Sequence, residues 1–402
     1  MLGSRGDSVS TVAARQGLAG EASVTAGLAA YARLVFEQRD LQPVWDALMA
    51  RASADPSDAG AMLDLSTLLQ LTGRREEGLA LQADALARQR LYRRVVGTGA
   101  GPRLLALVAA GDMMASTPLD FLLGGWNGVV DLLFLTAGGA PPEAPPDHDV
   151  AIVAVGESDA NAPILRALPS LDPARTLNPS ADAILALGRD RAPARLAGIE
   201  GLRAPRTLRR SHADLAAADD LPFPLIARPV DSHAGAGLQK LDDRRALLAY
   251  LGGRTEPTFY VSPFVDYSGP DGRFRKLRVA MVGGRPFLVH MAISDHWMVH
   301  YLNAGMDLDP AKRAEEAEAM ATFETGFAAR HGAALAAMHR AFGLDYFALD
   351  CAEDREGRLL LFEADTAMIV HDMDPPDLYP YKPPAMRKLF AAFQALVAGK
   401  AR

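Results

Sequence analysis

The sequence predicts a mixed α/β protein whose first part is all helical. Three observations support this class. Residues 25–97 carry apolar side chains at three- and four-residue spacing, which is typical of amphipathic helices. Residues 102–205 alternate short apolar runs with polar segments, which indicates a small parallel sheet with helices. Residues 206–402 mix hairpins with helices, so we expect three structured parts after a poorly ordered N-terminus, residues 1–24.

The composition is that of a globular protein. Of 402 residues, 49% are hydrophobic and 23% charged, and the net charge of −7 argues against a nucleic-acid binder. The single cysteine, Cys351, excludes an internal disulfide and fits a cytoplasmic location. The most apolar window, 119–136, contains Asp120 and Asp131, and the N-terminus lacks a signal-peptide core. We therefore expect a cytoplasmic protein that binds neither membranes nor nucleic acid.

The helical part contains one clear helical hairpin. The ranges 59–71 and 76–91 are its two helices, and Gly73 separates them. Their alternation of small and large apolar residues resembles a tetratricopeptide unit. Such a unit needs neighbours to bury its inner face, so we expect it to pack on the main body or on a second subunit. A plain helical hairpin with no partner role is the alternative.

Two parts of α/β character follow. In the first, the expected strands are 103–109, 130–135 and 149–155, with a proline-rich loop at 140–146 and a helix opened by 176–179. In the second, the expected elements are strands at 224–228 and 259–265, a glycine-containing loop at 231–237, a hairpin of 274–282 and 285–293 about Gly283 and Gly284, and a helix pair at 310–341.

The closing hairpin, 343–350 and 357–365, carries three carboxylates. Asp350 closes its first apolar run, and Glu363 and Asp365 close the second on one face, because strand side chains alternate with period two. Converging acids repel one another unless a cation lies between them. Oxygen ligands suit Mg²⁺, which commonly keeps a substrate phosphate as a further ligand. Solvated acids on the rim of a hairpin are the alternative.

Two basic features precede this hairpin. Arg228 ends a strand that feeds the loop 232–237, where a cation and glycine backbone N–H groups suit phosphates. In the run 275–278, alternation places Lys276 and Arg278 on one face. Both features therefore predict contacts to a phosphorylated ligand, with surface cations as the alternative.

Two stretches, 294–301 and 368–372, concentrate histidine, aspartate and aromatic residues. They are candidates for holding a substrate, and His296 or His300 could remove a proton from an attacking amine. A transition-metal site on the histidines does not fit the usual ligand spacing. Simple packing of a loop by Trp297 and Tyr301 is the alternative.

In this order, the strand with its cation, the small-residue loop, the apolar connector, the basic strand and the acidic hairpin resemble the ATP-grasp superfamily. The resemblance covers about residues 104–370, including an approach similar to the family's at 178–179 and 189–191. It implies ATP and Mg²⁺, with Mn²⁺ as an alternative ion. The family usually carries lysine where Arg191 and Arg228 stand and asparagine where Asp365 stands, so phosphate contacts and the metal ligand set depart from the pattern.

The resemblance also implies a role for each matching residue. The expected nucleotide contacts are Arg191, Arg228, Ser232, His233, Gly235, Gly237, Pro263, Val265 and Asp266. The expected catalytic cations are Arg228, Lys276 and Arg278, and the expected metal ligands are Asp350, Glu363 and Asp365. The expected substrate contacts are His296, Trp297, His300, Tyr301 and His371.

The activity that the resemblance implies is an ATP-dependent carboxylate–amine ligase that forms an amide through an acyl phosphate and releases ADP. Its substrates would be small molecules or peptides bearing a carboxylate and an amine. Related ligases are often dimers, so a homodimer is expected. Two alternatives stay open: a peptide-modifying ligase of a natural-product pathway whose helices hold the peptide, and a nucleotide-binding interaction module without chemistry.

Overall fold

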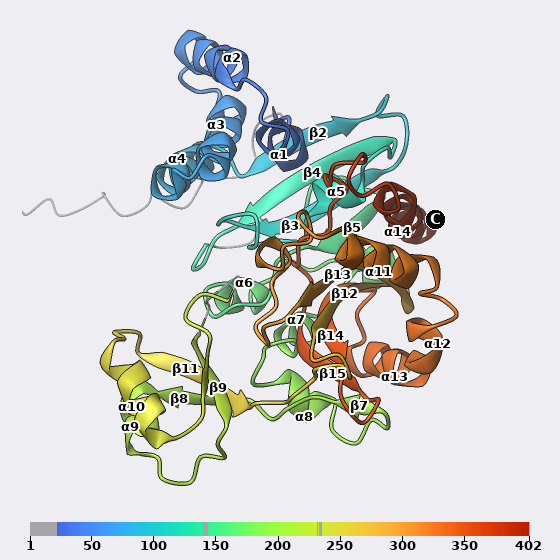
Figure 1. The fold of residues 1–402 in the computed structure, drawn as a ribbon. Helices are drawn as coiled ribbons and strands as arrows, with labels where there is room; N and C mark the ends of the chain where they lie inside the picture. The colour runs from blue at the N-terminus through green and yellow to red at the C-terminus, as the bar shows by residue number, and fades with distance from the viewer. Residues whose placement is uncertain (1–21, 140–143, 231, 233–234, 402) are drawn as a thin grey trace, which may run out of the picture.

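The computed structural model describes residues 22–139, 144–230, 232 and 235–401, which fold into three sheets covered by helices (Figure 1). The expectations for His233, for residues 1–21 and for part of the proline-rich loop fall outside the described residues. The mixed α/β class is confirmed. In the described chain, no helix combines the length and the apolar character needed to cross a membrane.

The N-terminal part contains the predicted helices. They are α1 (Leu28–Phe36), α2 (Gln42–Ala54), α3 (Ala59–Leu71) and α4 (Arg75–Arg88). Gly73 separates α3 from α4 with a φ of 85°, as a helix-terminating glycine should. The prediction of helix through residue 97 is wrong at its end, because Leu91–Val96 form strand β2. Valines and a tyrosine favour a strand there, and Arg93 is fixed to the buried Asp131 of the next strand.

The first sheet has the order β1-β2-β4-β3-β5-β6. Its strands are β1 (Ser23–Val24), β2, β3 (Arg103–Ala109), β4 (Gly128–Leu135), β5 (Val150–Val153) and β6 (Thr176–Leu177). Strands β4, β3 and β5 run parallel, as predicted, and the two-residue β6 extends this parallel order at the start of the segment expected to open a helix, whereas β2 runs antiparallel to β4. Strand β1 pairs in parallel with β2, so α1–α4 connect two adjacent strands of this sheet. Short helices α5 (Leu119–Leu122), α6 (Ala162–Leu165), α7 (Ala181–Leu185) and α8 (Ala192–Arg195) lie along the connections.

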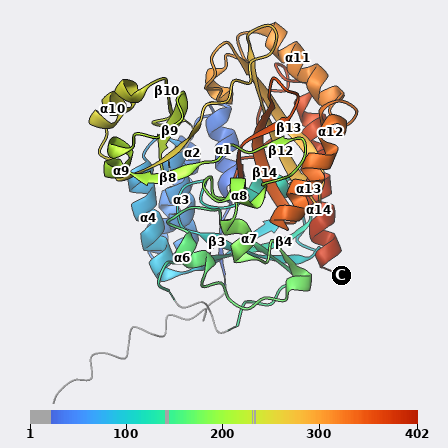
Figure 2. The same cartoon turned by 90° about the horizontal axis from the view of Figure 1, so that it is seen from below.

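The second sheet stands to one side of the molecule in both views (Figures 1 and 2). It is antiparallel, in the order β10-β9-β11-β8. Its strands are β8 (Leu208–Ser211), β9 (Leu225–Pro229), β10 (Gln239–Leu241) and β11 (Thr258–Pro263). Helices α9 (His212–Ala217) and α10 (Arg244–Gly252) pack on it around a separate core that includes the fully buried Leu247 and Phe259.

The third sheet has the order β13-β12-β14-β15-β7. Its strands are β7 (Leu202–Arg203), β12 (Phe274–Val282), β13 (Arg285–Ser294), β14 (Tyr346–Glu353) and β15 (Leu359–Asp365), and its helices are α11 (Pro310–Ala321), α12 (Phe327–Arg330), α13 (Gly332–Phe342) and α14 (Lys382–Lys400). The predicted hairpin turn is confirmed, with φ of 56° at Gly283 and 79° at Gly284.

The two faces of the third sheet carry different side chains. Cys351 lies in the core that includes residues of α13, on the face opposite Asp350. On the other face, Ala348 and Tyr346 pack with Phe393 of α14. Asp350 does not close its strand as predicted, because β14 continues to Glu353. Asp350 comes two residues after Ala348 and therefore lies on the same face of the sheet. It lies beyond the part of this face that α14 covers.

Candidate functional site

A row of polar side chains crosses four strands of the third sheet. His290, Arg278, Asp350 and Glu363 are register partners on β13, β12, β14 and β15 in turn. Directly opposed residues share one face of a sheet, so these side chains point the same way. The register shifts beside Arg278 and again beside Asp350. The second shift leaves Phe362 unpaired next to Glu363, and β-bulges re-aim side chains in this manner.

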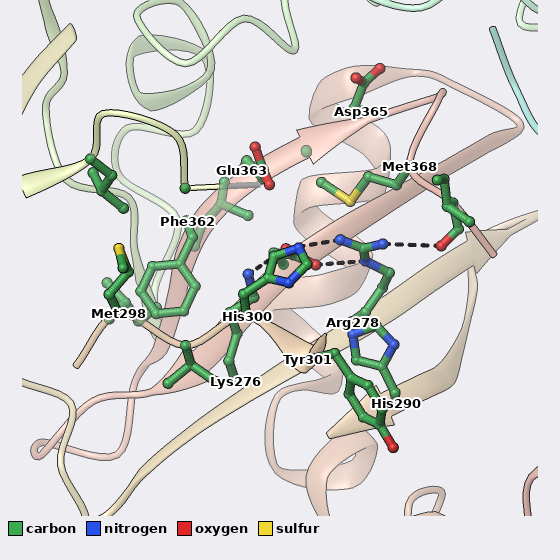
Figure 3. A pocket seen from close by; sticks show the side chains of 18 of the residues that line it. Lys276, Arg278, His290, Met298, His300, Tyr301, Phe362, Glu363, Asp365 and Met368 are labelled. Atoms are coloured by element: carbon green, nitrogen blue, oxygen red, sulfur yellow. Dashed lines mark hydrogen bonds and ion pairs between the residues drawn. The ribbon is translucent and has the colours of Figure 1, made fainter. Parts of the chain in front are cut away.

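The row opens into a cavity of about 750 Å³ (Figure 3), a size typical of small-molecule sites. Strand residues of the second and third sheets line it, together with Phe36 of α1 and with Met114 and Glu157 from the connections that follow β3 and β5 of the first sheet. The cavity brings together these residues named from the sequence: Arg228, Ser232, Gly235, Pro263, Val265, Lys276, Arg278, Trp297, His300, Tyr301, Asp350, Glu363, Asp365 and His371. Residues far apart in the chain therefore meet in one place, as their order along the sequence predicts.

Four residues named from the sequence are not among the described residues that line the cavity: Arg191, Gly237, Asp266 and His296. Arg191 is held in an ion pair with Glu157. Asp266 is paired with Arg355 at 3.0 Å. These two side chains are committed to surface or wall contacts, so the structure gives no support to nucleotide contacts from them.

Arg228 is a half-buried arginine without a carboxylate partner in the described part of the chain. It lies on β9, and its Nε donates a hydrogen bond to Ser232 Oγ at 3.0 Å. Burial and the nearby Arg189 lower the pKa of Arg228 to about 9. Such a cation is short of negative charge, and its planar N–H fork suits phosphate oxygens. This wall of the cavity is therefore suited to an anion.

Arg189 is a cavity residue that sequence reasoning did not select. It forms an ion pair with Glu363, and burial lowers its pKa. The sequence contains the run 189–191, and the family's pattern pointed to Arg191 rather than to Arg189. In the structure, Arg189 lines the cavity near Arg228 and Arg191 does not. The run 189–191 was the signal that could have found Arg189, and a nucleotide contact from Arg191 stays a prediction.

Asp350 is compensated by two cations. Its side chain is 1% exposed, and its two oxygens accept hydrogen bonds from Arg278 Nε at 2.8 Å and Nη2 at 3.1 Å. Lys276 Nζ lies 2.7 Å from Oδ2. Arg278 and Lys276 hold the pKa of Asp350 far below its usual range, although burial alone would raise it. The expected repulsion among three acids is therefore relieved at Asp350 by side-chain cations.

The cavity still offers oxygen donors for a divalent cation. Asp365 lies on the Glu363 side of the cavity, and its Oδ1 accepts from the backbone N–H groups of Ala367 at 3.1 Å and Glu157 at 3.4 Å. Burial raises the pKa of Asp365, which marks a carboxylate short of positive charge. Among the described residues, no three His, Cys, Asp or Glu side chains form a group that could hold a metal ion. Mg²⁺ usually uses one or two carboxylates plus substrate phosphates, and Glu363 with Asp365 fits that smaller donor set.

One end of the cavity is apolar and flat. Trp297 meets the Phe264 ring edge to face at 5.6 Å between centroids, and Lys240 Nζ lies 4.7 Å from the Phe264 centroid. The further apolar residues that line the cavity include Ile226, Leu238, Val265 and Leu361. Sequence reasoning placed a base-binding connector here but missed Phe264. The Phe264 backbone N–H donates to Pro224 O at 2.9 Å, so a ring bound here would rely mainly on stacking and apolar contact.

The opposite end combines histidines with apolar residues. His290, His300 and His371 line it, and burial lowers the pKa of each below the ordinary histidine value. Phe36 of α1 and Met114, which follows β3, also line the cavity. Sequence reasoning missed His290, although it follows the alternating pattern of the strand that pairs with 274–282.

No family model matches the chain, and no curated protein matches it. Among solved structures it is similar to a RimK-domain ATP-grasp protein from Sphaerobacter thermophilus, with 16% identity over 73% of this chain and 99% of that chain and a TM-score of 0.41. It is similar to the D-alanine–D-alanine ligase of Bacillus anthracis complexed with ATP, with 12% identity over 73% and 97% and a TM-score of 0.42. It is also similar to the VanG D-Ala:D-Ser ligase of Enterococcus faecalis, with 12% identity over 75% and 99% and a TM-score of 0.45. With TM-scores below 0.5 these are likenesses in outline only, and the function proposed below rests on the residues of the cavity.

Proposed function

We propose that this protein is an ATP-dependent carboxylate–amine ligase. The observation that carries the proposal is the arrangement of charges in one cavity. Arg228, which has no carboxylate partner among the described residues, lies near Arg189, and Lys276 and Arg278 lie together on β12. An apolar ring-sized end adjoins the first pair, and a histidine-rich end adjoins the second. A nucleotide, its phosphates and a second substrate can thus lie in one line.

The nucleotide is proposed to enter with its base in the apolar end against Phe264. Its phosphates would then approach Arg228 and Arg189, and the turn at Gly235, with a φ of 76°, leaves room for close backbone approach. Glu363 and Asp365 would hold a divalent cation, which when bound neutralises phosphate charge. The two arginines bind and orient the phosphates whether or not the cation is present.

The reaction is proposed to occur where Arg278 and Lys276 face the cavity. The substrate carboxylate attacks the γ-phosphorus of ATP, releasing ADP and leaving an acyl phosphate. The amine then forms a bond to the acyl carbon, and the phosphate leaves with its electron pair. Both steps develop negative charge on oxygen, which fixed cations stabilise. Asp350 holds both cations in place through three short contacts, so little reorganisation is needed.

A peptide-modifying ligase is the second candidate, and Phe36 favours it. This side chain of α1 lines the cavity, and α1 is tied to the 369–378 loop by an ion pair of Arg33 with Asp372. The N-terminal helices can therefore contact a larger substrate. Deleting residues 1–97 would not test this, because that range includes β1 and β2 of the first sheet.

The proposal is tested by measuring ADP release with Mg²⁺-ATP across a panel of amino acids and dipeptides, supplied as both acids and amines. We expect release that depends on a particular acid, and its loss in Glu363→Ala. The control is Glu356→Ala, whose side chain is 63% exposed on a surface turn. Full ligation by Glu363→Ala would refute the proposal. Calorimetric binding of Mg²⁺-ATP without ADP release under any mixture would favour the interaction module.

A further inference from the structure

We propose that His290 is the base that takes the proton from the attacking amine. This inference rests on the proposed ligase function and assigns a residue to its second step. His290 lies on β13 directly opposite Arg278, on the same face of the sheet, and lines the cavity. Figure 3 shows its ring beside Tyr301 on one side of Arg278. A carbonyl held by Arg278 therefore has this imidazole next to it.

Neither ring nitrogen of His290 has a hydrogen-bond partner among the described residues, whereas the other candidate histidines are engaged. A backbone N–H donates to Nδ1 of His296 at 3.1 Å and to Nδ1 of His371 at 3.2 Å. The ring of His300 accepts from a backbone N–H three residues on. His290 therefore has hydrogen-bonding capacity left for a substrate, as a base needs.

The ring of His290 is held against a fixed wall. Its centroid is 4.7 Å from that of Tyr301. The Tyr301 hydroxyl donates to Glu316 Oε2 at 2.9 Å, and Lys382 Nζ lies 4.0 Å from the Tyr301 ring centroid. Glu316 and Lys382 are 0% and 2% exposed and lie 3.5 Å apart as an ion pair. Tyr301 thus has little freedom to move, and it limits the orientations of the imidazole.

The surroundings keep the imidazole neutral. Burial is the largest effect and lowers the pKa of His290 well below the ordinary value. Arg278, Lys276 and Lys382 lower it further, and Asp350 opposes them. Tyr301, whose ring packs against the imidazole, is neutral because burial raises its pKa. A neutral imidazole has a free lone pair, and the proton on the amine nitrogen becomes much more acidic once that nitrogen bonds to the acyl carbon, so the imidazole can accept it there and pass it to the phosphate that leaves.

The test separates the two steps with hydroxylamine, a nucleophile that is uncharged at neutral pH and needs no base. We use the carboxylate of the panel that gives the highest ADP release, and compare hydroxamate with amide formation. In His290→Asn, hydroxamate formation stays within about 3-fold of the parent protein, whereas amide formation falls about 100-fold or more. Raising the pH towards the pKa of the amine restores amide formation. The control is His148→Asn, at a histidine that does not line the cavity, and it leaves both products unchanged.

A second variant guards against loss of the fold. In His290→Ala, added imidazole restores amide formation, which a purely structural role would not permit. Equal loss of hydroxamate and amide in His290→Asn, with no rescue of His290→Ala, would overturn the assignment while leaving the ligase function intact. Failure of the parent protein to form any hydroxamate would instead overturn the proposed function, and the base with it.

Discussion

Arg278 and Asp350 face each other across β12 and β14, and the guanidinium donates to both carboxylate oxygens, at 2.8 and 3.1 Å. Lys276 contacts the same carboxylate at 2.7 Å. One buried anion therefore holds two cations at the wall of the cavity. The cations are left uncompensated if the anion is removed, because the Arg278 and Lys276 side chains are each only 16% exposed.

Asp350→Asn is expected to lower the free energy of unfolding by about 3 to 5 kcal/mol, since it breaks a buried charge cluster by removing one partner. Urea denaturation measures the change. The matched control is Glu356→Gln, whose carboxylate is 63% exposed. A loss below about 1 kcal/mol, close to the value of a surface pair, would contradict this account of the cluster.

The same carboxylate predicts a dependence of stability on pH. Arg278 and Lys276 hold the pKa of Asp350 below its unfolded value, which is about 3.9. Its contribution to stability is therefore complete above that pH and is lost as the pH falls further. Between about pH 4 and pH 2, unfolding free energy should fall more steeply for the parent protein than for Asp350→Asn. Parallel curves would show that Asp350 does not titrate as described.

Arg228→Met should separate binding from stability. The charged form of Arg228 is disfavoured by burial and by Arg189, so replacing it by an apolar side chain should leave the melting temperature unchanged or raise it. The same change should abolish stabilisation by Mg²⁺-ATP, which is worth about 2.7 kcal/mol at 100 times the dissociation constant. Arg210→Met, on the exposed face of β8, is the control. Retained stabilisation by ATP in Arg228→Met would place the phosphates elsewhere.

Asp365→Asn tests the departure from the family's usual asparagine. Because burial raises the pKa of Asp365, a neutral amide should increase stability in the absence of ligand at pH 7. The change should also weaken the binding of a divalent cation. The Mg²⁺ concentration for half-maximal ADP release should then rise about 10-fold, which corresponds to about 1.4 kcal/mol of binding free energy. Titration of Mg²⁺ at saturating ATP measures this. An unchanged Mg²⁺ requirement would remove Asp365 from the ligand set.

Phe36→Ala tests the contribution of α1 to the substrate end. We expect KM for the second substrate to rise about 10-fold with little change in kcat, because a wall that binds substrate and transition state alike affects KM. Affinity for ATP should not change. Met49→Ala is a matched control, since Met49 is 43% exposed, Phe36 is 42% exposed, and Met49 does not line the cavity. Equal effects of the two changes would mean that α1 does not touch the substrate.

The sequence predicts elements well where a single pattern decides them. The strand 103–109 and the helix 59–71 have the predicted bounds, and the double-glycine turn lies where expected. Prediction from the sequence fails where contacts between distant segments determine the secondary structure. The segment Leu91–Val96 becomes a strand because a neighbouring strand pairs with it. Arg189 and Arg191 cannot be told apart from spacing, because the turn that aims only one of them into the cavity is set by the surrounding fold.

The site shows the same division. The charged residues of the hairpins, Lys276, Arg278 and Asp350, are recognisable because alternation on adjacent strands places them on one face. The pairing among them is not recognisable. Only the register shows that Asp350 pairs with two cations, and only the bulge beside Asp350 leaves Phe362 free to line the cavity. His290 can be seen in the sequence as a polar residue within an apolar strand, but only the pairing of that strand with β12 shows that it lies opposite Arg278.

The short pairing of β1 with β2 has a mechanical consequence. The strands before and after α1–α4 pair with each other in the first sheet. Both ends of this helical segment are therefore anchored, and the helices are not a separate unit joined by a single linker. Phe36 lines the cavity together with Met114 and Glu157, which follow β3 and β5 of this same sheet. Replacing α1–α4 by the helices of another protein would therefore also disturb the pairing of β1 with β2.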